Sequence, residues 1–274
     1  MEKIKELKNY FKYLKIDGYI VPKNNKFFGE YVSFNDDNLK YISNFSGSSG
    51  FAMLLKDKNY IFVDGRYTIQ ANIECGQNFK ICNLPDELPF KIFAKKKLII
   101  GFDPKLHTEN SLKTLFSKSQ IKLMPIEENL INKIWKSKKS LKNYPFYQLK
   151  QKATGESSNK KILKLKKIIR ANKADYFLIT ASENIAWLLN IRGFDSEYIP
   201  LPHSHALIES NGKINLFCNL RKLKKSLKVS LEKKIKIYDF DTLPSVIMKM
   251  FNKTIQIDSL TCSIFLKSII EKNN

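Results

Sequence analysis

Residues 61–71, IFVDGRYTIQA, decide the fold of this chain. An apolar run typical of a strand, Tyr60–Val63, ends at Asp64-Gly65, and a segment of helix-like composition begins directly after it. The first turn of that segment contains Arg66, one of four arginines against 44 lysines. A guanidinium at a strand end is well placed to clamp an anion with two parallel hydrogen bonds. Arg66 is therefore a candidate binding residue, although a capped helix start with a solvated arginine explains the same letters.

Strand-like and helix-like segments alternate on both sides of this stretch, in two successive halves. The first half has predicted strands at 19–21, 51–55, 60–63, 79–83, 97–102 and 121–125, and predicted helices at 3–16, up to Phe45 with Asp36 or Asp37 as the N-cap, from Arg66 to Gly76 and at 108–117. The second half has predicted strands at 175–180, 203–209, 213–219, 234–240 and 254–258, and predicted helices at 158–172, 183–190, 243–251 and 262–271. Ser182 is the predicted N-cap of the helix at 183–190, and Gly193 is predicted to end it. Asn211-Gly212 is the strongest hairpin signal. The pattern predicts two α/β domains, each a mixed sheet covered by helices.

The boundary between the halves is a stretch rich in Lys and Ser that lacks steady periodicity and contains Tyr144-Pro145. We therefore predict a first domain over 1–136, a linker over 137–157 and a second domain over 158–274. A chain of 274 residues is long enough for two domains of ordinary size. The letters themselves show no clean internal repeat.

Short motifs in both halves follow one another in the order found in a known enzyme family. The first-half motifs are Glu30-Tyr31, Tyr41–Phe45 with Ser46–Gly50, and Asp64-Gly65-Arg66-Tyr67 with Gln70-Ala71. The second-half motifs are Ile134-Trp135, Ile185–Gly193, Asp195 and Pro200. Over nearly the whole chain, this ordered set resembles the two N-terminal domains of the Xaa-Pro aminopeptidases (aminopeptidase P), members of the creatinase/prolidase superfamily.

The resemblance implies two similar creatinase-N-type domains with a ribonuclease-H-like fold. It also implies that the chemistry of the family belongs to a C-terminal pita-bread domain, which holds two divalent metals, manganese being the expected ion, through two Asp, one His and two Glu. The chain stops at Asn274, where that domain would begin. We therefore expect no catalytic residue, metal or cofactor in this chain. Because the family presents the equivalent arginine to the substrate, Arg66 is the expected substrate-binding residue.

His203-Ser204-His205 is the pair of histidines that most suggests a metal site. Residues two apart on a strand share a face, so two imidazoles could chelate one ion. No third ligand is evident nearby in the sequence, and an isolated pair is a weak metal signature. Structural or surface histidines are the favoured interpretation. The Asp and Glu residues are scattered and show no paired pattern for acid–base chemistry.

The small residues Ser46–Gly50 have the composition of a phosphate-binding loop but not its pattern. The stretch lacks the Lys-Ser/Thr that ends a P-loop, and it precedes a strand instead of a helix. It also contains no G-x-S-x-G nucleophile elbow. We therefore predict a tight turn.

Two tryptophans and one arginine have structural explanations. Trp135 and Trp187 lie on apolar helical faces and are expected in the core. Arg192 follows an apolar helix, and a salt bridge with Asp195 or Glu197 is its expected role.

The net charge of +22 invites a nucleic-acid interpretation. Residues 136–174 contain 13 Lys or Arg and one acidic residue, Glu156, as expected of a phosphate binder. However, almost all of the charge is lysine, whereas base readers use arginine forks. The excess also extends over helices, loops and linker alike. A solvated lysine-rich surface is therefore favoured, with no specific nucleic-acid partner.

The cellular context follows from the amino terminus and the cysteines. The segment 1–16 contains lysines throughout and lacks an apolar core, so it predicts an amphipathic helix and not a signal peptide. No apolar run approaches the ~20 residues of a membrane helix. The four cysteines show no C-x-x-C spacing and are expected to be free thiols. Together these features predict a cytoplasmic protein without a membrane partner.

The resemblance gives the expected function. The chain would be the non-catalytic N-terminal portion of a metal-dependent Xaa-Pro aminopeptidase, inactive alone, that shapes the peptide-substrate cleft and the dimer. Its partners would be the pita-bread domain, in cis or as a separate chain, and a second copy of itself. Two alternatives remain: a stand-alone peptide-binding or regulatory module, and a basic nucleic-acid-binding protein.

Overall fold

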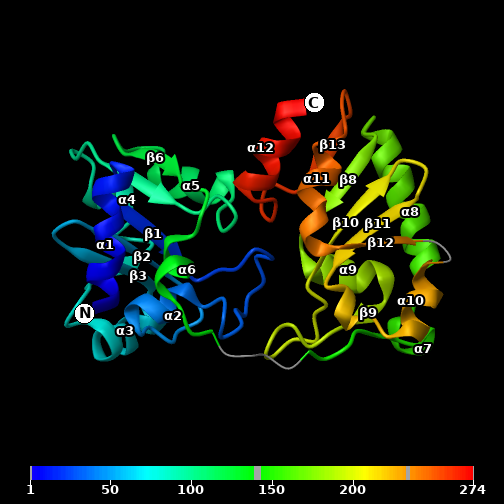
Figure 1. The fold of residues 1–274 in the computed structure, drawn as a ribbon, viewed down its shortest axis with the longest axis horizontal. Helices are drawn as coiled ribbons and strands as arrows, with labels where there is room; N and C mark the ends of the chain where they lie inside the picture. The colour runs from blue at the N-terminus through cyan, green and yellow to red at the C-terminus, as the bar shows by residue number, and fades with distance from the viewer. Residues whose placement is uncertain (1, 139–142, 233–234, 274) are drawn as a thin grey trace. The chain divides into compact units, whose positions relative to one another are not determined.

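The computed structural model describes residues 2–138, 143–232 and 235–273, and divides into two compact units (Figure 1). Unit 1 comprises Met1–Lys26 and Phe34–Ser140, and unit 2 comprises Phe27–Ser33 and Leu141–Asn274. The short segment Phe27–Ser33, which precedes most of unit 1 in the sequence, thus belongs to unit 2. The predicted linker, 137–157, contains a strand and a short helix that are part of unit 2, because Leu149 N donates to Asn190 O there.

Unit 1 is a six-stranded mixed sheet with helices on its faces. Its helices are α1 (Glu2–Leu14), α2 (Asn38–Ser43), the 3-10 turn η1 (Gly65–Tyr67), α3 (Thr68–Cys75), α4 (Pro89–Ile92), α5 (Glu109–Phe116) and α6 (Leu130–Ile134). Its strands are β1 (Gly18–Pro22), β2 (Phe51–Leu55), β3 (Asn59–Asp64), β4 (Lys80–Leu84), β5 (Ile99–Phe102) and β6 (Lys122–Pro125). The strand order is β4-β3-β2-β1-β5-β6. The strands β1, β2 and β3 pair antiparallel, while β4, β5 and β6 add in parallel.

Alternation along the central strands of unit 1 builds its core. One sheet face buries every second strand residue under α1, α2, α3 and α6, including Ala52, Leu54, Ile61 and Val63. The residues between them are also buried, so both faces of the sheet are covered. A strand buried on both faces appears as a continuous apolar run, which is why IFV at 61–63 predicted a strand without alternating polarity.

Unit 2 has a five-stranded mixed sheet and a small two-stranded sheet. Its helices are α7 (Gln151–Thr154), α8 (Ser158–Ala171), α9 (Ser182–Leu189), η2 (Leu220–Lys222), α10 (Lys225–Glu232), η3 (Phe240–Thr242), α11 (Leu243–Ile247) and α12 (Ile264–Asn273). Its strands are β7 (Tyr147–Gln148), β8 (Tyr176–Ile179), β9 (Ile191–Arg192), β10 (Ser204–Glu209), β11 (Ile214–Cys218), β12 (Ile235–Asp239) and β13 (Ile255–Ile257). Helices α8, α9 and α10 pack on one face, and α11 and α12 on the other (Figure 1).

The two units share one topology. Unit 2 has the order β12-β11-β10-β8-β13, with β7-β9 separate. In this order, each strand takes the place of one strand in the series β4-β3-β2-β1-β5 of unit 1, and every pair of neighbours runs in the same relative direction. The strand β10, like β2, is antiparallel to both of its neighbours, while β12 and β13, like β4 and β5, are parallel to theirs. The predicted pair of similar α/β domains with mixed sheets is therefore confirmed, and β6 is the extra strand of unit 1.

Two predicted details of α9 were wrong. Ser182 was predicted as the N-cap, but Ala181 occupies that position, and the Ser182 hydroxyl accepts from Ser204 N. Gly193 was predicted to end the helix, but Asn190 ends it in the left-handed conformation with φ 56°. Asparagine tolerates this conformation better than most residues, so the helix ends before the glycine is reached.

Candidate functional site

Asp64, the last residue of β3, organises the turn that contains Arg66. Its Oδ1 accepts a hydrogen bond from Arg66 N at 2.9 Å and thereby caps η1. The helix α3 follows immediately, so a strand end, a turn and a helix start meet here. This is the local structure that the Asp-Gly-Arg-Tyr motif predicted.

The same carboxylate orients the Arg66 guanidinium. Arg66 Nε donates to Asp64 Oδ1 at 3.1 Å, and Nη2 donates to Oδ2 at 2.7 Å. Hydrogen bonds from Arg66 lower the pKa of Asp64. The Arg66 side chain is 75% exposed, so the pair contributes little to stability, but it restricts the direction in which the guanidinium points. The arginine is therefore an oriented cation at the surface of unit 1, with the Tyr67 ring 5.4 Å away.

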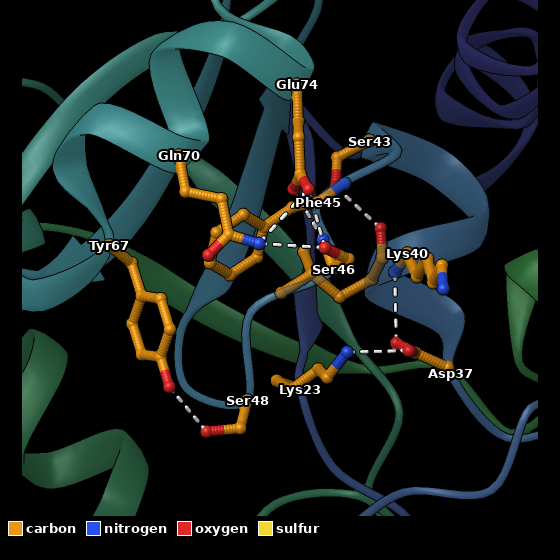
Figure 2. Close-up of polar contacts among 11 residues, drawn as sticks. Lys23, Asp37, Lys40, Ser43, Phe45, Ser46, Ser48, Tyr67, Gln70 and Glu74 are labelled. Carbon is orange, nitrogen blue, oxygen red and sulfur yellow. Dashed lines mark hydrogen bonds and ion pairs between the residues drawn. The ribbon is translucent and has the colours of Figure 1, made fainter.

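A polar network fixes the loop Ser46–Gly50 beside α3 (Figure 2). Ser46 N donates to Glu74 Oε2 at 2.7 Å, and the Ser46 hydroxyl donates to Glu74 Oε1. Gln70 Nε2 donates to Ser46 Oγ at 2.8 Å. Partial burial opposes ionisation of Glu74, but the hydrogen bonds from Ser46 and Gln70 outweigh it and lower the pKa of Glu74. The carboxylate is thus a fixed anchor for the loop.

The other end of the loop is held by Tyr67 and by glycine geometry. Tyr67 and Ser48 share a hydrogen bond of 2.8 Å between their hydroxyls. A Cβ on Gly47 would lie 2.3 Å from the Phe45 ring. Gly50 has φ +146°, and its Cβ would lie 2.6 Å from a backbone carbonyl oxygen. The stretch bends at Ser48-Ser49, and it is tied to the motif of Arg66 through Tyr67.

A buried ion pair supports the neighbouring helix α2. Lys23 Nζ lies 2.6 Å from Asp37 Oδ2, and both side chains are less than a tenth exposed. Asp37 Oδ1 also accepts from Lys40 N at 3.0 Å and caps α2, as predicted (Figure 2). The sequence did not indicate the role of Lys23. With 44 lysines in the chain, residue type alone cannot single out the one that is buried.

The histidines lie in aromatic or buried surroundings. The His203 ring stacks on Phe27 at 4.1 Å, and the His205 ring lies 5.3 Å from Phe27 and 4.8 Å from Phe240, all within unit 2. His107 is buried in unit 1. Across residues 2–138, 143–232 and 235–273, no three or more His, Cys, Asp or Glu side chains cluster closely enough to hold a metal ion. The described side chains therefore do not fit a two-metal centre.

Two predictions about the second half were wrong. Arg192 donates from Nη1 to Ala186 O and Ile191 O, whereas Asp195 forms its ion pair with Lys222. Trp187 is 55% exposed. The apolar face of α9 is occupied by other side chains, and the Trp187 ring lies instead over Lys161, 4.5 Å from Nζ. Trp135, in contrast, is buried in unit 1 and stacks on Tyr41 at 4.4 Å.

Both halves of the chain match models of one domain family. Residues 3–134 and residues 137–274 each match a Creatinase/Prolidase N-terminal domain. The chain belongs to this family. The motif of Arg66 and the Ser46–Gly50 loop lie in the first of these domains.

The curated relatives include proteins of Coprinopsis cinerea and Dictyostelium discoideum. The chain is 30% identical over 247 residues to a probable Xaa-Pro aminopeptidase P of Coprinopsis cinerea, covering 86% of this chain and 40% of that protein. It is 30% identical over 261 residues to Xaa-Pro aminopeptidase 1 of Dictyostelium discoideum, covering 88% of this chain and 41% of that protein. The chain therefore spans about two-fifths of the length of these relatives.

A solved structure has the same fold. The X-prolyl aminopeptidase of Caenorhabditis elegans, described as a cytosolic enzyme with a di-nuclear active site, matches with a TM-score of 0.90 and 24% identity. The match covers 99% of this chain and 49% of that protein. In the part of the chain that the structure describes, no helix combines the length and apolar character needed to cross a membrane.

Proposed function

We propose that this chain is the non-catalytic N-terminal portion of a metal-dependent Xaa-Pro aminopeptidase. The observation that supports this most strongly is the pair of family matches, which together account for nearly the whole chain. Relatives that carry the Xaa-Pro aminopeptidase name are about two and a half times as long as the matched region. In the complete assembly, the reaction is hydrolysis of the peptide bond before a proline at the second position.

The catalytic centre belongs, in this proposal, to a pita-bread domain present in cis or as a separate chain. The described residues contain no cluster suited to a metal ion, so the two divalent metals, manganese being the expected ion, would be held by that domain. The two units would limit access to the peptide cleft and take part in a homodimer. The assembly would work in the cytoplasm.

Arg66 is the proposed contact from this chain to the substrate. It is exposed, it is oriented by Asp64, and it lies beside a loop that Glu74 and Tyr67 hold in place. A planar guanidinium in such a position can pair with a carboxylate or with peptide carbonyl oxygens. Because the interaction is charge-assisted, its loss should cost about 1.5–3 kcal/mol, or roughly 10–150-fold in kcat/KM.

The test joins this chain to the remaining C-terminal part of the Dictyostelium relative. Release of arginine from the peptide Arg-Pro-Pro is measured with manganese present, for the 274-residue chain alone and for the fusion. We expect turnover by the fusion only, and a fall in kcat/KM of at least about tenfold for Arg66→Ala. Arg66→Lys tests the need for the planar fork, and Arg170→Ala controls for loss of an exposed arginine elsewhere.

Two results would separate the parts of this proposal. An unchanged kcat/KM in the Arg66→Ala fusion would remove the role of Arg66 but leave the scaffold assignment intact. Turnover by the purified 274-residue chain, at a rate unaffected by further purification, would remove the non-catalytic assignment.

A further inference from the structure

The turn that contains Arg66 has a structural duplicate in unit 2. In each unit, the helix before the second strand of the shared topology ends at a left-handed asparagine, Asn44 with φ 68° and Asn190 with φ 56°. Three residues later each unit has a glycine, Gly47 and Gly193, and a Cβ on either would collide with neighbouring atoms at less than 3 Å. The two units therefore share a left-handed asparagine that is followed, three residues later, by a crowded glycine.

The equivalence continues at the next strand end. Asp64 ends β3 and caps η1 by accepting a hydrogen bond from Arg66 N, and Asn219 directly follows β11 and caps η2 by accepting one from Arg221 N at 3.1 Å. In unit 1, the next residue, Tyr67, bonds to the glycine-containing loop. In unit 2, the corresponding residue, Lys222, forms an ion pair with Asp195 of the corresponding loop.

A hollow lies at this duplicated place in unit 2. It encloses about 450 Å³ and is lined by Pro145, Phe146, Tyr147, Phe194, Lys224 and Leu227, with polar residues around them. A second hollow of about 360 Å³ adjoins it, because Gln148 and Ser230 line both. The helix α10 provides one side of each hollow, at the same end of unit 2 as β9 (Figure 1).

Two partly exposed aromatic rings, Phe194 and Tyr147, line the first hollow, and a third ring, Tyr144, packs against Phe194. Phe194 is 57% exposed, Tyr144 is 49% exposed and Tyr147 is 38% exposed. The Phe194 ring contacts the other two, at 5.7 Å from Tyr144 and 5.5 Å from Tyr147. Exposed aromatics gathered at a concave surface are typical of binding sites.

The backbone of β7 provides a polar anchor next to these rings. Tyr147 pairs with Arg192 and Gln148 with Ile191 in an antiparallel ladder, and Leu149 N donates to Asn190 O. Because ladder bonds alternate along an antiparallel strand, Tyr147 and Leu149 direct their backbone groups toward β9. The N–H and C=O of Gln148 therefore face the opposite edge, between the two hollows. An extended ligand can hydrogen-bond there.

We propose that the paired hollows of unit 2 bind an extended, proline-containing peptide segment that carries an acidic residue. Prolines in the polyproline II conformation dock between aromatic rings at low entropic cost, since the ligand is already extended. Charge complementarity indicates that the ligand carries an acidic residue. Among the described residues, Lys224 is the one charged side chain in the linings of the two hollows, and a carboxylate of the ligand can pair with it. The site is independent of the peptidase assignment, because it requires no free peptide amine.

A single-stranded nucleic acid is the less favoured occupant. Such ligands use aromatic rings for stacking, but they also need a track of cations along the backbone. The two hollows together are lined mostly by Ser, Asn, Gln, Leu and aromatic side chains. This lining provides hydrogen bonds and apolar contact for a peptide rather than a row of phosphate contacts.

Isothermal titration calorimetry on the full chain tests the proposal. The probe is acetyl-Pro-Pro-Glu-Pro-Pro-amide, whose blocked N-terminus excludes recognition of the aminopeptidase type. Acetyl-Gly-Gly-Glu-Gly-Gly-amide is the charge-matched control peptide, and a ten-nucleotide oligothymidylate tests the alternative. The variants are Phe194→Ala, with Phe251→Ala as its control at 64% exposure in the same unit, and Lys224→Gln, with Lys225→Gln as its control.

We expect saturable binding of the proline peptide, about tenfold weaker in Phe194→Ala and about threefold weaker in Lys224→Gln. The control variants should stay within about twofold of the parent chain. No binding at millimolar peptide, equal affinity for the glycine peptide, or the same loss in Phe251→Ala would each overturn the proposal. Binding of oligothymidylate that depends on Phe194, without binding of the peptide, would assign the hollow to nucleic acid instead.

Discussion

Acidification from pH 7 to pH 5 should destabilise unit 1 through His107. The His107 ring is 3% exposed, and its Nδ1 lies 2.9 Å from Asp103 O. Since a carbonyl only accepts, Nδ1 carries the proton and Nε2 is the unprotonated nitrogen, buried without a hydrogen-bond partner among the described residues. Burial lowers the pKa of His107 from 6.5 to about 4. A proton on Nε2 would be a buried charge with no acceptor.

The change in stability with pH follows from the difference in the pKa of His107 between the folded and the unfolded chain. The folded state holds its proton less tightly than the unfolded state, so between pH 6.5 and about 4 the unfolded chain binds more protons at this site. Stability is therefore present above pH 6.5 and is lost as the pH falls through this window. For a pKa that drops from 6.5 to about 4, the loss between pH 7 and pH 5 is ~2 kcal/mol.

The neighbouring Asp103 acts in the opposite direction. Its burial raises the pKa of its carboxyl, which accepts from Asn129 Nδ2 and Lys105 N. Because the pKa of Asp103 is raised in the folded state, the folded chain binds this proton more tightly than the unfolded chain does. Acidification therefore stabilises the folded state through Asp103 and offsets part of the effect of His107. The contribution of His107 must therefore be measured as a difference from a variant that cannot titrate. His107→Asn removes the titration but leaves an amide that can donate to Asp103 O.

The assay is urea unfolding followed by tryptophan fluorescence. In a Trp187→Phe background, Trp135 is the remaining tryptophan, and it is buried in unit 1 against Tyr41. Free energies of unfolding are measured at pH 7 and pH 5 with and without His107→Asn. We expect the parent to lose ~2 kcal/mol more than the variant over this range. Equal losses in the two proteins would refute the reasoning, because the titrating group would then lie elsewhere.

Two substitutions test the strained backbone at Gly50 and the hydrogen bonds of Lys161 to the end of α9. Gly50→Ala should destabilise unit 1 by about 2 kcal/mol or more, because φ is positive there and the added Cβ would collide with a backbone carbonyl oxygen. The control is Gly155→Ala, where φ is also positive, at +68°, but no atom lies within 4 Å of the added Cβ; equal melting temperatures for the two variants would contradict this prediction. Lys161→Ala should destabilise unit 2 by about 2 kcal/mol, because Lys161 Nζ donates to Trp187 O and to Asn190 Oδ1 at 2.7 Å each. The loss of stability should be measurable by unfolding followed through Trp187 fluorescence. Lys160→Ala, at an exposed lysine, is the control. An equal loss of stability in that variant would argue against a role for the two hydrogen bonds of Lys161.

Local chemistry allowed much of the fold to be predicted. Asn211-Gly212 requires a tight hairpin, and the structure places Gly212 at φ +92° between β10 and β11. The apolar runs 51–55 and 60–63 became β2 and β3 because both sheet faces are covered. In these cases the signal lies within a few residues of the element that it specifies.

Contacts between distant residues were not predictable in the same way. The ion pair of Asp195 with Lys222 joins residues 27 positions apart, and the sequence suggested Arg192 as the partner of Asp195 because it is the nearer cation. Likewise, nothing in the sequence links Ser46 to Glu74, 28 positions away. Residue type limits which pairs are chemically possible, but only the folded backbone decides which are brought together.

The same distinction explains why the duplication is hidden in the letters. The positions shared by both units are those where the backbone itself makes demands: the left-handed asparagines 44 and 190, and the crowded glycines 47 and 193. The residue after each crowded glycine differs, with Ser48 in unit 1 and Phe194 in unit 2. The two places thus share these backbone features and differ in side-chain chemistry. The same pair of constrained backbone positions thus lies in the unit that presents the oriented cation Arg66 and, in the other unit, beside the aromatic hollow at Phe194.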